Sequence, residues 1–209
     1  MVFIPSRSLS NDTNINTDVA VLLLFSSNEV FKPSNTGRLI LDTVKDGYAY
    51  QWSRTEPNQK LLDLLNDPKY SPIVVFPKDY VESKSRIVSE ENVRQFHSTG
   101  KKPLLIFLDG SWREARRMFR KSPYLDSFPV LSVSPQTLSQ YSMRQSDNDQ
   151  HLATVEVASV VLNQLGEESA ATTLSLWFDA FKESYLMSKS QNKSDMQRPK
   201  LQSYLNQEQ

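Results

Sequence analysis

The sequence contains no cysteine, and that absence excludes several kinds of functional site. Without thiols the chain can form no disulfide, no cysteine-ligated zinc site, no iron–sulfur cluster and no thiol nucleophile. Histidine occurs only as His97 and His151, so a catalytic metal centre built on histidine is not expected either. We therefore expect a functional site without a metal, in a chain that folds equally well in a reducing compartment.

Long apolar runs and an excess of charge of one sign are also missing. The longest apolar run, VAVLLLF at residues 19–25, is far shorter than the roughly 20 residues that span a bilayer. Residues 1–18 contain no continuous apolar segment of the kind found in signal peptides. The 24 basic residues balance 24 acidic ones, so any contact with nucleic acid needs a local basic patch. We expect a cytoplasmic protein that makes no use of a membrane.

Apolar runs alternate with helical patterns along most of the chain. Strands are expected at 19–25, 48–52, 72–77, 104–109 and 130–134. Helices are expected at 35–44, 58–67, 89–100, 154–166 and 171–189. This alternation predicts an α/β fold with a mainly parallel sheet flanked by helices. Ligands of such sheets gather outside the carboxyl ends of the strands.

Composition divides the chain into three parts. Residues 1–18 are polar and are expected to form a flexible N-terminal arm. Residues 19–187 hold all the expected strands and almost all of the expected helical sequence, and form one domain. Residues 188–209 are polar, which predicts a disordered or peripheral tail.

A carboxylate stands between a buried strand and a helix in the stretch LDGSWREA at 108–115. Ser111 and Glu114 have the spacing of a capping box, and Gly110 allows a sharp turn before the helix. Asp109 is thereby placed beside free N–H groups of the helix, which favour its ionised form. The pattern suits a catalytic or ligand-binding carboxylate, and equally a strand end and a helix cap with no further role.

The expected helix after Asp109 is basic on one face and apolar on the other. Helical spacing gathers the basic side chains on one face, with the lysine at its flank: Arg113, Arg116, Arg117, Arg120 and Lys121. The opposite face holds Trp112, Ala115, Met118 and Phe119. A solvated face is the ordinary explanation of such a charge run. Because the row has no acidic neighbour except Glu114 and like charges repel, we favour phosphate binding instead.

A later polar segment offers a second group of candidates. Ser139, Tyr141 and Arg144 fall in an expected loop, and Thr154 and Glu156 open the helix that follows. These residues are compatible with an ordinary loop followed by a helix start and equally with a functional site. Spacing alone does not distinguish the two.

Five segments resemble, in this order, the DTW-domain family. They are EVFKPSNTGRL at 29–39, VVFP at 74–77, LDGSWREARRMFRKSPYL at 108–125, SQYSMR at 139–144 and LATVEVAS at 152–159. The resemblance runs from about Val19 to Leu165. Members of the family are tRNA-uridine aminocarboxypropyltransferases that use S-adenosylmethionine and are related to the knotted SPOUT methyltransferases. The resemblance therefore implies a SPOUT-like domain with a C-terminal trefoil knot, and tRNA as the partner.

The chain departs from the family pattern in four respects. Ser111 replaces the usual threonine and keeps its hydroxyl. Ser26 stands where a histidine is usual, and Ala153 where a serine is usual. The N-terminal cysteine cluster of many relatives is absent.

The resemblance also implies roles for individual residues. Asp109 would either accept the proton of uridine N3 or hold the ammonium group of S-adenosylmethionine, and both roles need an ionised carboxylate. Arg144, with Arg38 as second choice, would pair with the cofactor carboxylate. The expected cofactor-binding residues are Asp109, Gly110, Ser111, Trp112, Leu131, Val133, Tyr141, Arg144, Thr154 and Glu156. The expected RNA-binding residues are Asn35, Thr36, Arg38, Arg113, Arg116, Arg117, Arg120 and Lys121.

Three functions remain open at this level. The first is aminocarboxypropyl transfer to a tRNA uridine. The second is methyl transfer, or action on ribosomal RNA, by an enzyme of the same fold. The third is an RNA-binding module without catalysis. The sequence does not identify the tRNA, the uridine or the oligomeric state.

Overall fold

The computed structural model describes residues 14–29, 32, 34–89, 92, 100–133, 153–189 and 198–206. The strands are β1 Ala20–Phe25, β2 Gly47–Gln51, β3 Tyr70–Val75, β4 Ile87–Val88, β5 Lys102–Asp109 and β6 Val130–Leu131. The α-helices are α1 Gly37–Thr43, α2 Gln59–Asn66, α3 Trp112–Arg120, α5 Thr154–Gln164, α6 Glu168–Lys189 and α7 Pro199–Asn206. Single 3-10 turns are η1 Lys78–Tyr80, η2 Lys84–Arg86 and η4 Pro123–Leu125.

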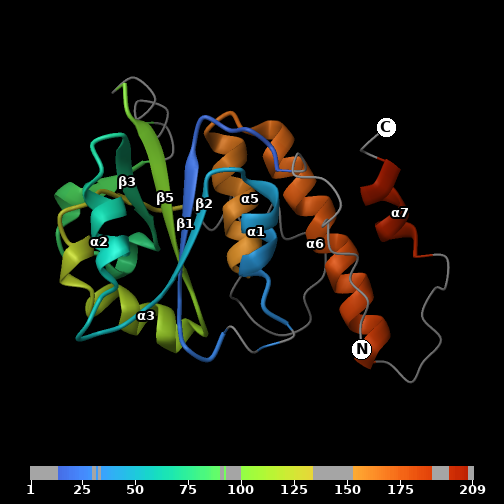
Figure 1. The fold of residues 1–209 in the computed structure, drawn as a ribbon, viewed down its shortest axis with the longest axis horizontal. Coiled ribbons are helices and arrows are strands. Elements are labelled where there is room, and N and C mark those ends of the chain that lie inside the picture. Colours follow the sequence, from blue (N-terminus) through green and yellow to red (C-terminus); the bar gives the residue numbers. More distant parts are fainter. Residues whose placement is uncertain are drawn as a thin grey trace.

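One parallel sheet separates two layers of helices (Figure 1). The strand order is β2-β1-β5-β3-β6-β4, and each neighbouring pair runs parallel. Helices α2 and α3 lie on one side of the sheet, and α1, α5 and α6 lie on the other (Figure 1). The predicted α/β class with a parallel sheet flanked by helices is confirmed.

The unbroken apolar runs of β1 and β5 follow from burial on both faces of the sheet. In β1, Val21 and Leu23 belong to the core beneath α1, α5 and α6, whereas Leu22 and Leu24 belong to the core beneath α2 and α3. Successive side chains of a strand point to opposite faces, so two helical layers leave no position for a polar residue.

Most of the predicted elements are confirmed with shifted ends. The strand expected at 130–134 is only two residues long, and β4 was not expected, because a two-residue strand has no readable periodicity. The helix expected at 89–100 falls largely outside the described residues. The chain between Val133 and Ala153 also lies outside them, so the trefoil knot stays a prediction.

Both predicted ends of the domain need correction. Ile15 pairs with Val44 in a parallel bridge, so the last residues of the expected arm belong to the fold. The expected disordered tail contains α7, which packs on α6. The Glu183 carboxylate on α6 accepts hydrogen bonds from the backbone N–H groups of Lys200 and Leu201, at 3.2 and 3.1 Å, and so caps this helix. Composition alone does not show this helix, because its cap and its packing come from the preceding helix α6.

Tyr204 anchors α7, and its removal is expected to destabilise the whole domain. The side chain is 4% exposed, and its ring stacks on Trp177 at 5.0 Å between centroids. Tyr204→Ala should lower the free energy of unfolding by about 2 to 4 kcal/mol, because it leaves a cavity beside Trp177. Leu205 is the matched control, since it is 47% exposed and Leu205→Ala should change stability by no more than about 0.5 kcal/mol. Urea unfolding of both variants makes the comparison, and equal effects would contradict the packing of α7.

No helix in the described part of the chain combines the length and apolarity needed to cross a membrane.

Candidate functional site

Asp109 lies at the carboxyl edge of the sheet, at the end of a central strand. In the parallel register Asp109 is beside Phe25, the last residue of β1. The backbone N–H of Ser26 donates to the carbonyl of Asp109 at 2.9 Å, so the residue in place of the family's histidine directly adjoins this carboxylate residue. Three parallel strands, β1, β5 and β3, therefore direct their following loops to one place, as ligand sites in such sheets require.

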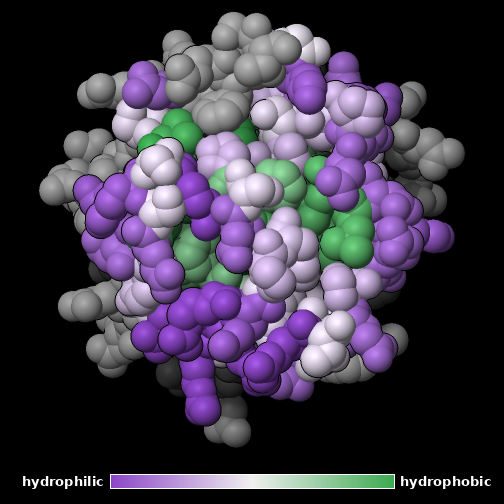
Figure 2. Space-filling model, turned by 90° about the vertical axis from the view of Figure 1, so that its left-hand side faces the viewer, coloured by the Kyte–Doolittle hydropathy of each residue, from purple (hydrophilic) through white to green (hydrophobic). Residues whose placement is uncertain are grey.

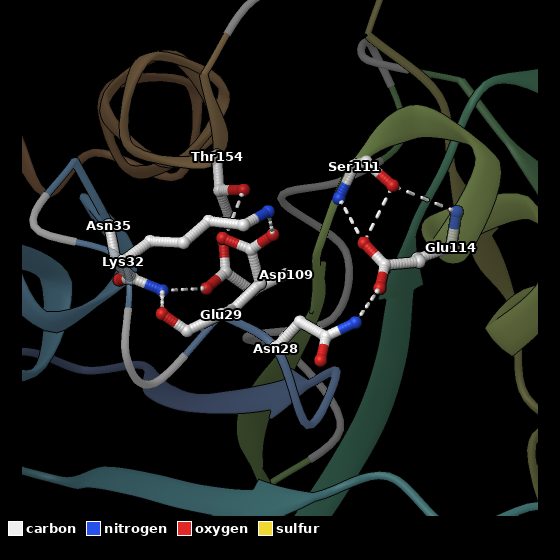
Figure 3. Close-up of polar contacts among 8 residues, drawn as sticks. All are labelled: Asn28, Glu29, Lys32, Asn35, Asp109, Ser111, Glu114 and Thr154. Atoms are coloured by element: carbon white, nitrogen blue, oxygen red, sulfur yellow. Dashed lines mark hydrogen bonds and ion pairs between the residues drawn. The ribbon is translucent and has the colours of Figure 1, made fainter.

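Two donors from distant segments hold the Asp109 carboxylate (Figure 3). The Thr154 hydroxyl donates to Oδ1 at 2.8 Å, and the Asn35 amide donates to Oδ2 at 2.9 Å. The Asn35 amide also donates to the carbonyl of Glu29 at 3.2 Å. Each carboxylate oxygen can accept more than one hydrogen bond, so these contacts orient Asp109 and leave acceptor capacity for a ligand.

Burial raises the pKa of the Asp109 carboxyl, which is 5% exposed, so the expected net effect in favour of the ionised form was wrong. The hydrogen bonds from Thr154 and Asn35 act in the opposite direction, because they stabilise the charged form. The nearby Glu29 carboxylate adds to the rise, and Lys32 opposes it. A carboxylate with a raised pKa takes up a proton more readily than an exposed one, as a general base must.

An ion pair lies beside Asp109 that the sequence analysis did not single out. Glu29 is 8% exposed, and its carboxylate pairs with the ammonium group of Lys32 (Figure 3). The hydrogen bond to Glu29 raises the pKa of Lys32. The signal was present in the segment EVFKPSNTGRL as a glutamate and a lysine three residues apart, but spacing alone does not show that they face Asp109.

Gly37 is a third residue that the sequence analysis missed. A Cβ atom at this position would lie 2.8 Å from Oδ2 of Asp109 and 2.8 Å from a methyl group of Leu23. Such contacts are too close for carbon, so only glycine lets the start of α1 approach the carboxylate this closely. The start of α1 therefore lies close against the Asp109 carboxylate because residue 37 is glycine.

The predicted capping box of α3 is confirmed. The Glu114 carboxylate accepts from the backbone N–H of Ser111 at 2.9 Å and from its hydroxyl at 2.6 Å, and the N–H of Glu114 donates to the Ser111 hydroxyl at 3.4 Å. The hydrogen bond from the Ser111 side chain is the main cause that lowers the pKa of Glu114. The side chain of Asn28 donates to the other oxygen of Glu114 at 3.4 Å. Ser111 and Glu114 thus set the direction of α3 away from Asp109.

The other predicted residues divide between the Asp109 site and its surroundings. Asn35, one of the expected RNA-binding residues, donates to Asp109, and Thr36 is the N-cap of α1 without a side-chain bond. Arg38 is exposed at the start of α1. Glu156 accepts from the backbone N–H of Ala153 at 2.9 Å and so caps its own helix.

Leu131 and Val133, two of the expected cofactor-binding residues, lie at the same edge of the sheet. Leu131 is fully buried, and its carbonyl accepts from the N–H of Phe76 at 3.1 Å; Val133 follows it and is half-buried. Tyr141 and Arg144 lie outside the described residues, and their roles stay predictions.

The predicted division of α3 into two faces is confirmed. Ala115, Met118 and Phe119 are buried, and Trp112 is half-buried. The basic side chains are exposed except Arg116, which is half-buried: Arg113, Arg116, Arg117, Arg120 and Lys121. Among the described residues no carboxylate forms a salt bridge with them, since Glu114 is used by the cap. Figure 2 shows a strongly hydrophilic area at the height of α3.

Thr154→Val tests how the site tunes Asp109. Valine keeps the shape of threonine but removes the hydroxyl that donates to Oδ1. Because that bond lowers the pKa of Asp109, its loss should raise this pKa further and move the acidic limb of the pH–activity profile to higher pH. Activity should fall most at mildly acidic pH and recover as the pH rises. Thr154→Ser keeps the donor and should restore the original profile, whereas a shared profile for all three proteins would contradict the role of Thr154.

Comparison with protein-family models identifies a family that covers nearly the whole domain. The family model described as DTW domain matches residues 6–186. No solved structure matches this chain. DTW domains are associated with transferases that modify tRNA, so the match implies a tRNA-modifying or otherwise RNA-related role. Within the described residues there is no group of three or more histidine, aspartate or glutamate side chains that would hold a metal ion.

Proposed function

Because the chain belongs to the DTW-domain family, we propose that it is a tRNA-uridine aminocarboxypropyltransferase. The reaction moves the 3-amino-3-carboxypropyl group of S-adenosylmethionine to N3 of a tRNA uridine. The observation that carries the proposal is Asp109, a buried carboxylate held by Asn35 and Thr154 at the carboxyl edge of the sheet, directly before a basic helix.

The residues around Asp109 fit the amino-acid end of S-adenosylmethionine, which carries an ammonium and a carboxylate. Asp109 has acceptor capacity for the ammonium group, and the missing side chain of Gly37 leaves the approach to its Oδ2 clear of a Cβ atom. Arg144, or as second choice Arg38, which is exposed at the start of α1, would pair with the carboxylate. Backbone groups at Leu131 and Val133, at the same edge, would take the adenine. When bound, the donor supplies a carbon already activated by its sulfonium, so the chemistry needs no metal.

Asp109 serves the reaction in one of two ways. As a general base it takes the proton from uridine N3, and its raised pKa then brings proton affinity nearer to neutral pH. As an ammonium ligand it orients the donor, and Asn35 and Thr154 keep its two oxygens in place. Calorimetry of donor binding separates the roles: Asp109→Asn abolishes donor affinity in the second case and spares it in the first.

The experiment that tests the proposal is nucleoside mass spectrometry of tRNA from cells with and without this protein. A 3-(3-amino-3-carboxypropyl)uridine that disappears with the protein supports the proposal. Purified protein, tRNA and S-adenosylmethionine should then release methylthioadenosine. A methylated nucleoside with S-adenosylhomocysteine, a product confined to ribosomal RNA, or no change in any nucleoside would contradict it.

A further inference from the structure

A stack of aromatic rings runs from the core to the surface at α3. The rings of Phe119 and Phe76 lie 4.3 Å apart at an interplanar angle of 8°, and those of Phe76 and Trp112 lie 5.6 Å apart at 15°. Tyr80 meets Trp112 edge to face at 5.2 Å. Phe76 and Phe119 are buried, Trp112 is half-buried, and Tyr80 is 38% exposed. The packed inner rings therefore support aromatic surface that solvent can reach.

Arginines of α3 lie against this aromatic surface. The Arg116 guanidinium is 5.7 Å from the Trp112 ring centre and 6.0 Å from that of Tyr80. On the other side of the helix, the Arg117 guanidinium is 5.6 Å from the ring centre of Trp52. These are cation–π distances. The basic face of α3 is thus bordered by aromatic rings on both sides.

The position of Tyr80 links this surface to the Asp109 site. Tyr80 follows β3 and Trp112 follows β5, and these two strands are adjacent and parallel. Both rings therefore lie beyond the carboxyl edge that also holds Asp109. Three large apolar or aromatic side chains are exposed among the described residues, and Tyr80 is the one outside α6 and α7.

We infer that the surface formed by Tyr80, Trp112 and the α3 arginines binds unpaired nucleotides of RNA, an inference that deepens the proposed function and rests on it for the kind of ligand. Phosphate binding alone would need only the arginines. Partly exposed rings beside them add a surface on which bases stack, and a base offers its face only when it is not stacked inside a duplex. The RNA segment brought to Asp109 is therefore single-stranded or a loop.

The test compares Tyr80→Leu and Tyr80→Phe in binding to labelled single-stranded oligouridylate, with no donor present. Tyr80→Leu should weaken binding about 5- to 150-fold, the range expected for the loss of one base–aromatic stack. Tyr80→Phe keeps the ring and should bind like the wild-type chain. Neither change removes a positive charge, so the dependence of affinity on salt should stay the same. Affinity for a blunt RNA duplex should be equal for all three proteins.

Phe178 supplies the control, because it is a partly exposed ring with a cation above it, as Tyr80 is. The Lys182 ammonium is 4.3 Å from its ring centre, and both residues are on α6, on the other side of the sheet. Phe178→Leu should leave oligouridylate binding unchanged. Thermal unfolding of each variant verifies that a lost affinity is not a lost fold.

Two results would overturn the inference. One is unchanged oligouridylate affinity in Tyr80→Leu. The other is an equal loss of affinity for the duplex or for polyaspartate, which would make the surface a general anion or protein contact. Failure of the proposed function would give a different result. If Tyr80→Leu loses oligouridylate binding but the wild-type chain transfers nothing to tRNA, the RNA-binding surface is supported and the transferase activity is contradicted.

Discussion

Asp109→Asn is expected to lower the rate of aminocarboxypropyl transfer by at least about a hundredfold, because both proposed roles require a negatively charged carboxylate at position 109. The substitution keeps the shape of the side chain. Its amide oxygen can still accept from Asn35, and the Thr154 hydroxyl can turn to accept from the new NH2 group. The measurement is the initial rate of product formation on tRNA. Near-normal rates would contradict both proposed roles, and Asp109 would then only end β5.

The same variant should be at least as stable as the wild-type chain at neutral pH. Burial raises the pKa of Asp109 above its value in the unfolded chain, so the folded state holds the proton more tightly. The stability that this group contributes is present at low pH and is lost as the pH rises through the folded pKa. The stability advantage of Asp109→Asn should therefore be largest at neutral pH and shrink on acidification, as urea unfolding at several pH values would show. Asp126→Asn, at an exposed carboxylate, should alter neither rate nor stability.

Joint replacement of Arg116, Arg117 and Arg120 by glutamine is expected to weaken tRNA binding strongly while sparing donor binding. Each lost phosphate contact makes the slope of log affinity against log salt shallower by about 0.9, taking the value for duplex DNA, so three contacts give up to about 2.7. Glutamine keeps good helix propensity, and the buried face of α3 is unchanged. The variant loses the cation–π contacts of two arginines and gains relief from their repulsion, so stability should change by no more than about 1 kcal/mol.

The matched control removes three charges from the opposite edge of the sheet. Lys45, Lys69 and Lys101 are exposed and precede β2, β3 and β5, so they lie at the amino ends of the strands. Their joint replacement by glutamine should leave tRNA affinity and its salt dependence as they were. If the arginine variant binds tRNA with the affinity and salt dependence of the wild-type chain, the basic face of α3 is only a solvated surface. The RNA would then reach Asp109 from another side.

Features that depend on neighbouring residues could be predicted from the sequence. The unbroken apolar runs of β1 and β5 predicted strands buried on both faces, because burial sets their composition directly. Ser111 and Glu114 predicted the start of α3, because a capping box joins residues three positions apart. The division of α3 into a basic and an apolar face followed from helical periodicity alone. The position of Asp109 at a strand end was predictable for the same local reason.

Only the tertiary structure decided what surrounds Asp109. Asn35 and Thr154 are 74 and 45 residues away from it in sequence, and the parallel sheet brings them to its two oxygens. Local periodicity carries no information about such contacts, because they depend on which strands become neighbours. The same reason applies to Gly37, whose missing side chain matters only where α1 meets the carboxylate, and to the contact of the Tyr80 ring with Trp112.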